Sequence, residues 1–265
     1  MGINHRDGGL QMNIEEALGQ LGVTSTTLSD EEKRQLDEEG YLILTDFIDH
    51  GLLKALQDKY EELMEREGQN AGKEFQQEAG TRRLSDLINK GQEFDICWQH
   101  PKILAIAYHV IGRDFKVNSI NGRDALPGQG HQDLHADWGP RRLDDLYGGV
   151  NTIWLLDDFT PDNGATRFVP ATHKLAGSPK DYVMDVRAPH PDEQLVIAKA
   201  GTVFAYNMHM WHGGTQNRTN KTRRVLHPSF IAREFPQQYN QKEFLRKSTY
   251  DRLSPAARYI LDVDE

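Results

Sequence analysis

The spacing of three side chains constrains this sequence most. His135 and Asp137 lie two positions apart, and His212 follows far downstream. Successive side chains of an extended segment alternate between two faces, so His135 and Asp137 point the same way. The pattern predicts residues 203–212 as a strand, which can return to the first segment only in a closed antiparallel structure. Two imidazoles and one carboxylate on one face would leave roughly three coordination positions open, as in a facial triad for ferrous iron.

The first part of this triad has a rival nearby in the sequence. His131 and Asp133 have the same spacing, and on an unbroken strand all four side chains would share one face. Residues 127–130, Pro-Gly-Gln-Gly, indicate a bend, so we expect the regular strand to begin near residue 132. This favours His135 and Asp137 as the metal-binding pair.

The second part of the triad also has a rival. His209 precedes His212 by three positions, so the two side chains would lie on opposite faces of a strand. Gly213 and Gly214 remove side chains beside His212, which suits close approach of the backbone to a ligand. We therefore expect His212 to complete the triad.

Two adjacent arginines, Arg223 and Arg224, open the next run of strand type. In a barrel this run lies one strand away from His212, where a guanidinium can bind the distal carboxylate of a diacid with two hydrogen bonds. The two side chains point to opposite faces, and the pattern leaves open which one enters the pocket. Trp154 is similarly ambiguous between pocket wall and core.

Composition limits the class of protein. In a chain of 265 residues, 31 basic against 40 acidic residues give a net charge of −9, which argues against general binding to nucleic acid or to an anionic membrane. A single cysteine, Cys97, cannot form an internal disulfide. Residues 103–111, the most apolar stretch, are too short to span a membrane. We expect a cytoplasmic protein.

Helical signals dominate the first part of the chain. Residues 1–27 are polar, and we expect a mobile arm with a short helix near 14–21. Ser29 and Glu32 form a capping-box signature for a helix that ends near residue 40, and residues 41–44 indicate a strand. Asp49 can cap the following helix, and Pro101 opens another that ends at residue 112. Residues 68–80 are expected to form a surface loop or lid.

Short strand-type runs dominate from residue 115 onward. They cover residues 149–159, 165–169, 194–198, 202–211 and 223–231. Residues 162–164, Asp-Asn-Gly, predict a hairpin turn between two of these runs. Helical character returns near residues 253–261. The pattern predicts a mainly β chain with flanking helices (α+β) and a barrel or jelly-roll core.

These motifs together resemble the phytanoyl-CoA dioxygenase family of iron- and 2-oxoglutarate-dependent oxygenases, over most of the chain. The segments that carry the resemblance are residues 121–123, 127–128, 132–138, 153–159, 163–170 and 212–214, with Asn217 and Arg223. The family has Leu before its metal histidine, which favours His135 over His131. Its arginine for 2-oxoglutarate follows the second histidine by eleven residues, which favours Arg223 over Arg224.

The resemblance also implies softer assignments. Gln132, Thr166 and Trp154 would contact or border 2-oxoglutarate. Members usually carry Gly where this chain has Ala171, and because Ala tolerates positive φ poorly, the local turn is expected to differ. Similar halogenases replace the carboxylate of Asp137 with a small residue, so its presence argues for hydroxylation or a related oxidation.

The resulting hypothesis is a double-stranded β-helix (jelly-roll, cupin-like) domain over residues 28–265, with N-terminal helices packed on one sheet. His135, Asp137 and His212 would hold Fe(II) as the catalytic centre, and Arg223 would bind 2-oxoglutarate. The resemblance implies oxidation of a small-molecule C–H bond with O2, releasing succinate and CO2. We expect a monomer or weak homo-oligomer. The alternative function is a non-catalytic, cupin-like sensor of a metal or small ligand.

Overall fold

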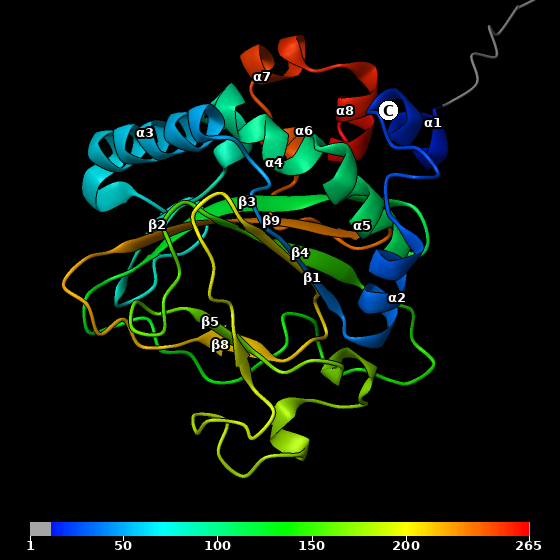
Figure 1. The fold of residues 1–265 in the computed structure, drawn as a ribbon. Coiled ribbons are helices and arrows are strands. Elements are labelled where there is room, and N and C mark those ends of the chain that lie inside the picture. The colour runs from blue at the N-terminus through cyan, green and yellow to red at the C-terminus, as the bar shows by residue number, and fades with distance from the viewer. Residues whose placement is uncertain (1–11, 265) are drawn as a thin grey trace, which may run out of the picture.

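The computed structural model describes residues 12–264, whose strands form two antiparallel sheets. A six-stranded sheet, here the major sheet, has the order β1-β7-β4-β9-β3-β2, and a three-stranded minor sheet has the order β6-β5-β8. Figure 1 shows helices above the major sheet and the minor sheet against its other face. The predicted jelly-roll core with helices on one sheet is confirmed. In the same range, no helix combines the length and apolar character needed to cross a membrane.

The elements follow one another as the sequence predicts in outline. The helices are α1 Ile14–Gln20, α2 Asp30–Glu38, α3 His50–Glu67, α4 Ile96–Gln99, α5 Pro101–Ile111, α6 Gln241–Phe244, α7 Lys247–Arg252 and α8 Pro255–Leu261, with short 3-10 turns η1 Gly68–Asn70, η2 Leu87–Asn89, η3 Gln92–Asp95, η4 Thr172–Lys174 and η5 Pro179–Asp181. The strands are β1 Tyr41–Leu44, β2 Thr81–Leu84, β3 Phe115–Ala125, β4 Gly149–Leu155, β5 Thr166–Phe168, β6 Gln194–Leu195, β7 Val203–Asn207, β8 His212–Gly214 and β9 Arg223–Ala232.

The predicted helix boundaries are confirmed by their caps. The Ser29 hydroxyl accepts from the Glu32 backbone N–H at 3.2 Å, and the Glu32 carboxylate accepts from the Ser29 N–H at 2.8 Å. The Asp49 carboxylate caps α3 by accepting from the Leu52 backbone N–H at 2.8 Å. Helix α5 begins at Pro101 and ends before Gly112, whose φ of 69° is left-handed. Each cap satisfies backbone groups that a helix end leaves unpaired.

The major sheet buries apolar side chains on both faces. Leu56, Ile106 and Trp154 belong to the core beneath the helices, whereas Ile153 and Phe168 belong to a second core between the two sheets. Full burial of a large apolar side chain contributes about 1.5–3 kcal/mol. Because side chains alternate along each strand, both faces of the major sheet are buried in a core, and only the face toward the minor sheet can contribute to a site between the sheets.

Three sequence-based expectations about the chain path are wrong. Residues 12–27 are not a mobile arm, because Ala17 and Leu18 of α1 are buried in the core and α1 packs against α8. Residues 1–11 of that arm lie outside the described residues. The turn at 162–164 joins no hairpin, since β4 pairs with β7 and β9 whereas β5 pairs with β6 and β8.

The third error concerns residues 203–212, which are not one strand. Strand β7 ends at Asn207, whose side-chain oxygen accepts from the His209 N–H at 3.0 Å while its carbonyl accepts from the Met210 N–H at 2.8 Å. This Asx-type turn redirects the chain into β8 of the minor sheet. His212 therefore reaches the space between the sheets from the minor sheet.

Ala171 does not change the local turn as expected. Its φ of 62° is left-handed, and its N–H donates to the carbonyl of Glu39 at 2.9 Å. The turn thus keeps the positive φ that glycine would adopt more easily, at a cost on the order of 1 kcal/mol.

Candidate metal centre

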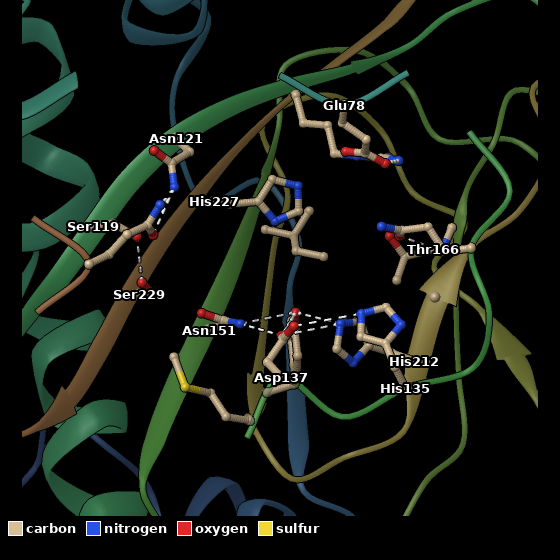
Figure 2. Close-up of a pocket in the computed structure, with 18 of the residues that line it drawn as sticks. Glu78, Ser119, Asn121, His135, Asp137, Asn151, Thr166, His212, His227 and Ser229 are labelled. Carbon is tan, nitrogen blue, oxygen red and sulfur yellow. Dashed lines mark hydrogen bonds and ion pairs between the residues drawn. The ribbon is translucent and has the colours of Figure 1, made fainter. Parts of the chain in front are cut away.

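Two histidines and one aspartate converge between the sheets, as Figure 2 shows. His135 lies on an extended segment that pairs with β8: its N–H donates to the His212 carbonyl at 2.9 Å, and the His212 N–H donates back at 2.8 Å. Asp137 Oδ1 lies 3.6 Å from His135 Nε2, and Asp137 Oδ2 lies 3.2 Å from His212 Nε2. One ligand atom from each residue lies within 4.8 Å of the others. The segment carrying His135 is bridged to β8 rather than part of a regular strand.

The backbone fixes the tautomer of both imidazoles. His135 Nδ1 lies 2.7 Å from the Asp133 carbonyl oxygen, and His212 Nδ1 lies 3.0 Å from that of Met210. A carbonyl oxygen only accepts, so each Nδ1 carries the hydrogen and donates it. Each Nε2 is then the ring atom directed toward Asp137, and a bound metal would take the place of any proton that this nitrogen shares with the carboxylate.

The Asp137 carboxylate is held ionised and in place. Burial alone would raise the pKa of Asp137, but His212 and His135 beside it hold that pKa well below its usual value. Asn151 Nδ2 donates to its Oδ2, and the Tyr206 hydroxyl donates to the same oxygen at 3.0 Å. The donor set therefore fits a divalent metal, with one negative charge and two neutral nitrogens.

Sequence analysis missed Asn151 and Tyr206. Both lie two positions from inward-facing apolar residues, Ile153 and Phe204, so strand alternation placed them on the pocket side. Burial and the adjacent Asp137 raise the pKa of Tyr206 well above its usual value, so its phenol stays protonated and can donate. A polar side chain among apolar ones on an inward face was the signal that could have found them.

The rival ligands lie elsewhere. His131 and Asp133 are exposed. His209 is buried in the turn before β8 against the rings of Trp138 and Tyr147, and neither of its ring nitrogens has a hydrogen-bond partner among residues 12–264. Burial lowers the pKa of His209 to about 4, so it is neutral. None of the three belongs to the convergent set.

Arg223 is a buried cation facing the pocket. Its guanidinium lies 4.2 Å above the Phe159 ring, and Nη2 donates to the Gly164 carbonyl at 2.8 Å. Its Nε has no hydrogen-bond partner within the described residues. Burial and the like charge of Arg123 lower the pKa of Arg223 to about 9, still high enough to keep it cationic. The guanidinium has no counter-ion among the described residues, and an anion bound in the pocket would supply one.

Arg224 points to the opposite face of β9. Its guanidinium binds Asp157 at 2.6 Å and Glu61 at 3.3 Å. The adjacent arginines thus divide between pocket and salt bridge, and the one without a counter-ion faces the metal ligands.

The softer site predictions divide as well. Gln132 and Thr166 line the pocket, and Gln132 Oε1 accepts from the Gly214 N–H at 2.9 Å. Trp154 does not line the pocket: it lies on the outer face of β4, edge-on to Phe47 beneath the helices. The prediction that Trp154 borders a cosubstrate is wrong because alternation turns Ile153 inward instead.

Gly213 and Gly214 allow the metal-binding segment to approach β8. A Cβ at Gly214 would lie 2.5 Å from the Gly130 carbonyl oxygen, and one at Gly213 would lie 3.1 Å from that of Asp133. The close approach therefore involves residues 130–133, whose backbone lies against these glycines where the sequence pattern suggested a ligand.

A cavity of about 580 Å³ surrounds the side chains of His135, Asp137 and His212. Its other lining residues are Phe75, Gln76, Glu78, Arg83, Asn118, Ser119, Asn121, Arg123, Gln132, Trp138, Asn151, Ile153, Thr166, Tyr206, Met208, Gly213, Gly214, Arg223, His227, Ser229 and Gln238. The predicted loop at residues 68–80 contributes Phe75, Gln76 and Glu78 to this lining. The volume suits a small molecule beside a cosubstrate.

A jelly-roll with two histidines and an aspartate open to a cavity defines the class of non-haem metal oxygenases. The family model described as phytanoyl-CoA dioxygenase (PhyH) matches residues 36–225. The chain belongs to the phytanoyl-CoA dioxygenase family, and the predicted family and dioxygenase class are confirmed.

Two relatives and one solved structure illustrate this membership. The chain is 27% identical to the dioxygenase trt7 of Aspergillus terreus, over 89% of this chain and 84% of trt7. It is 29% identical to the Fe(II)/2-oxoglutarate-dependent dioxygenase nvfF of Aspergillus novofumigatus, over 68% of this chain and 61% of nvfF. HygX from Streptomyces hygroscopicus, solved with nickel and 2-oxoglutarate bound, shares the fold with a TM-score of 0.66 and 18% identity, over 79% of this chain and 89% of HygX.

Proposed function

We propose that this chain is an Fe(II)- and 2-oxoglutarate-dependent oxygenase that oxidises a C–H bond of a small molecule. His135, Asp137 and His212 hold the iron, and Arg223 binds the distal carboxylate of 2-oxoglutarate. The observation that carries the proposal is the pairing of this convergent ligand set with a buried arginine that lacks a counter-ion. A sensor would need neither the open metal positions nor this second anchor.

When bound, iron and 2-oxoglutarate supply the oxidising chemistry, which consumes O2 and releases succinate and CO2. The chain supplies placement. The backbone carbonyls of Asp133 and Met210 orient the imidazoles, while Asn151 and Tyr206 orient the carboxylate. Gln132 and Thr166 border the cosubstrate beside Arg223, where their polar groups can bind carboxylate oxygens.

An anaerobic titration tests this proposal. Adding ferrous iron and then 2-oxoglutarate should produce the weak visible charge-transfer band of the chelate, and admitting air should release succinate. A band and succinate that both require iron support the assignment. Their absence from folded protein would favour the sensor.

We also propose that the protein works in the cytoplasm as a monomer or weak homo-oligomer. A reducing compartment keeps iron ferrous and leaves the buried thiol of Cys97 unpaired. Sedimentation at several protein concentrations tests the oligomeric state, and a tight oligomer at the lowest concentration would contradict it.

A further inference from the structure

The cavity extends along β9, and its two ends differ. Arg223, His227 and Ser229 line it from the same strand, on alternating positions. Six residues separate Arg223 from Ser229, which is about 20 Å along a strand. Figure 2 shows Ser229 on the far side of the ligand cluster from Thr166, with His227 between them. A five-carbon diacid anchored at Arg223 therefore leaves the Ser229 end free.

Neutral polar side chains form that end, here called the polar end. It consists of Asn118, Ser119, Asn121, Ser229 and Gln238. The Ser119 and Ser229 hydroxyl oxygens lie 2.9 Å apart. Asn118 Nδ2 donates to Ser229 Oγ at 3.1 Å, and Asn121 Nδ2 donates to Ser119 Oγ at 3.3 Å and to Gln238 Oε1 at 3.2 Å.

This network has more donors than acceptors. Two hydroxyl hydrogens belong to Ser119 and Ser229, and the bond between them uses one, so the other has no acceptor in the network. The buried Nε2 of Gln238 has no partner within the described residues. The amide oxygens are already engaged, since Asn118 Oδ1 accepts from the Gln238 N–H at 2.7 Å and Asn121 Oδ1 accepts from the Tyr239 hydroxyl at 3.3 Å.

No charge belongs to the polar end. Three charged residues of the lining pair with one another, since Glu78 binds Arg123 at 2.7 Å and Arg83 at 3.2 Å. An ionised substrate group placed against Ser119 and Ser229 would lose its hydration without meeting a counter-ion. A hydrocarbon there would leave the buried donors unsatisfied. Both classes are therefore disfavoured.

We propose that the polar end binds an uncharged substrate rich in oxygen acceptors, such as hydroxyl, ether or carbonyl groups. One of these oxygens accepts from the free hydroxyl of the Ser119–Ser229 pair. The inference rests on the proposed function of the same cavity. It adds the chemical class of molecule that the oxygenase oxidises.

A size-matched panel of compounds tests the inference. It contains uncharged oxygen-rich molecules (polyols, glycosides and lactones), carboxylates, amines and hydrocarbon alcohols. Two readouts are taken: the thermal shift of the metal-free protein, and stimulation of succinate release from iron- and 2-oxoglutarate-loaded protein. Stimulation and shifts should be confined to the uncharged oxygen-rich group.

Variants then locate the binding end. Replacing both hydroxyls, Ser119→Ala with Ser229→Ala, should raise the KM of the best compound about tenfold, because each lost hydrogen bond costs several-fold in affinity. Succinate release without substrate should stay within twofold. Ser85→Ala, which removes a buried hydroxyl outside the cavity, is the matched control and should leave KM unchanged.

Two kinds of result would overturn the inference. One is a panel in which charged or hydrocarbon members act best, or in which no oxygen-rich member acts. The other is a double variant whose KM matches that of the control. Basal succinate release keeps the two proposals apart: if it persists in either case, only the substrate class is wrong, and if it is absent throughout, the oxygenase assignment fails.

Discussion

The two sheets are held together in different ways. In the major sheet, β3 and β9 pair over eleven and ten residues, whereas β5 and β8 of the minor sheet have three residues each and β6 has two. The minor sheet depends on side chains: Arg167 donates to the carbonyls of Gln132, Val186 and Ala188, each at 2.9 Å. His212 is therefore positioned by a short strand that a few side-chain hydrogen bonds hold in place, whereas Arg223 is positioned by the extended backbone pairing of β9 with β3.

The largest expected effect is on the metal ligand from the minor sheet. His212→Ala should lower turnover by more than the roughly 10- to 100-fold typical of residues that only support a ligand. The protein should still fold, but its thermal transition should no longer rise on addition of ferrous iron. His209→Ala is the matched control, because His209 is buried nearby without contacting the ligand cluster. A metal-induced shift that survives in His212→Ala would remove His212 from the site.

The next largest effect concerns Arg167, whose hydrogen bonds hold the minor sheet in place. Arg167→Met would leave three buried carbonyls and Glu193 without their cation, which should lower the free energy of unfolding by about 4 kcal/mol. Arg224→Met removes a partly exposed ion pair of the major sheet and should cost about 1 kcal/mol or less. Urea denaturation measures both values, and hydrogen exchange should show β5 and β8 opening first in Arg167→Met. Equal losses of unfolding free energy in the two variants would show that the minor sheet does not depend on side-chain contacts more than the major sheet does.

Substitution of Arg223 tests whether the major sheet supplies the residue that binds the cosubstrate. Arg223→Met should weaken 2-oxoglutarate binding about 100-fold, or ~3 kcal/mol, because a buried carboxylate would lose its charged partner. Without 2-oxoglutarate the variant should be at least as stable as the parent, since an uncompensated buried cation has been removed. Calorimetry of 2-oxoglutarate binding checks the first point. Arg224→Met again serves as control, and an equal loss of affinity there would refute the assignment of Arg223.

The smallest effect lies in the layer that covers the major sheet. Burial raises the pKa of Asp86 from 3.8 to about 6, although its hydrogen bonds from Asn89 oppose the rise. A raised carboxyl pKa favours the folded state at low pH, and this contribution is lost as pH rises from about 4 through 6. Asp86→Asn should therefore raise stability by about 2 kcal/mol at pH 8 and leave it unchanged at pH 4.

Hydrogen exchange completes that test. Exchange from β5 and β8 should be the same in Asp86→Asn and in the parent if the minor sheet opens independently of the helical layer. A pH-independent gain would instead show that the pKa of Asp86 does not differ between the folded and unfolded states.

Sequence alone predicted which three side chains converge, because a metal-binding pattern leaves a local signature. His135 and Asp137 share a face by spacing, and two glycines mark the close approach beside His212. The helix caps were also predictable from the sequence, because Ser29 and Asp49 form hydrogen bonds with backbone groups that are close in sequence. These features depend on residues close in sequence, so a single chain is enough to predict them.

The wrong predictions have a different cause. The alternation of side chains along a strand does not show which other element packs against each face of that strand. Trp154 belongs to the right strand but to its outer face, and the turn at Asn207 splits a run that alternation predicts as continuous. The hydrogen bonds that Asn151 and Tyr206 donate to Asp137 depend on the pairing of β4 with β7, two strands that are distant in sequence. Tertiary pairing, not local pattern, decided these points.

The main-chain bonds to both imidazoles have a consequence for metal choice. Because the carbonyls of Asp133 and Met210 already set the ring orientation, and Asn151 sets the carboxylate, the ion finds its ligands prearranged and induces no folding. A prearranged ligand set of this kind can bind any divalent ion of similar size. The intrinsic affinity of the site for each metal then follows the Irving–Williams order, in which nickel and copper bind more tightly than iron. Purified protein should therefore carry whichever of these metals its growth medium supplied, and the cell's pool of ferrous iron, rather than the shape of the site, keeps the enzyme correctly loaded.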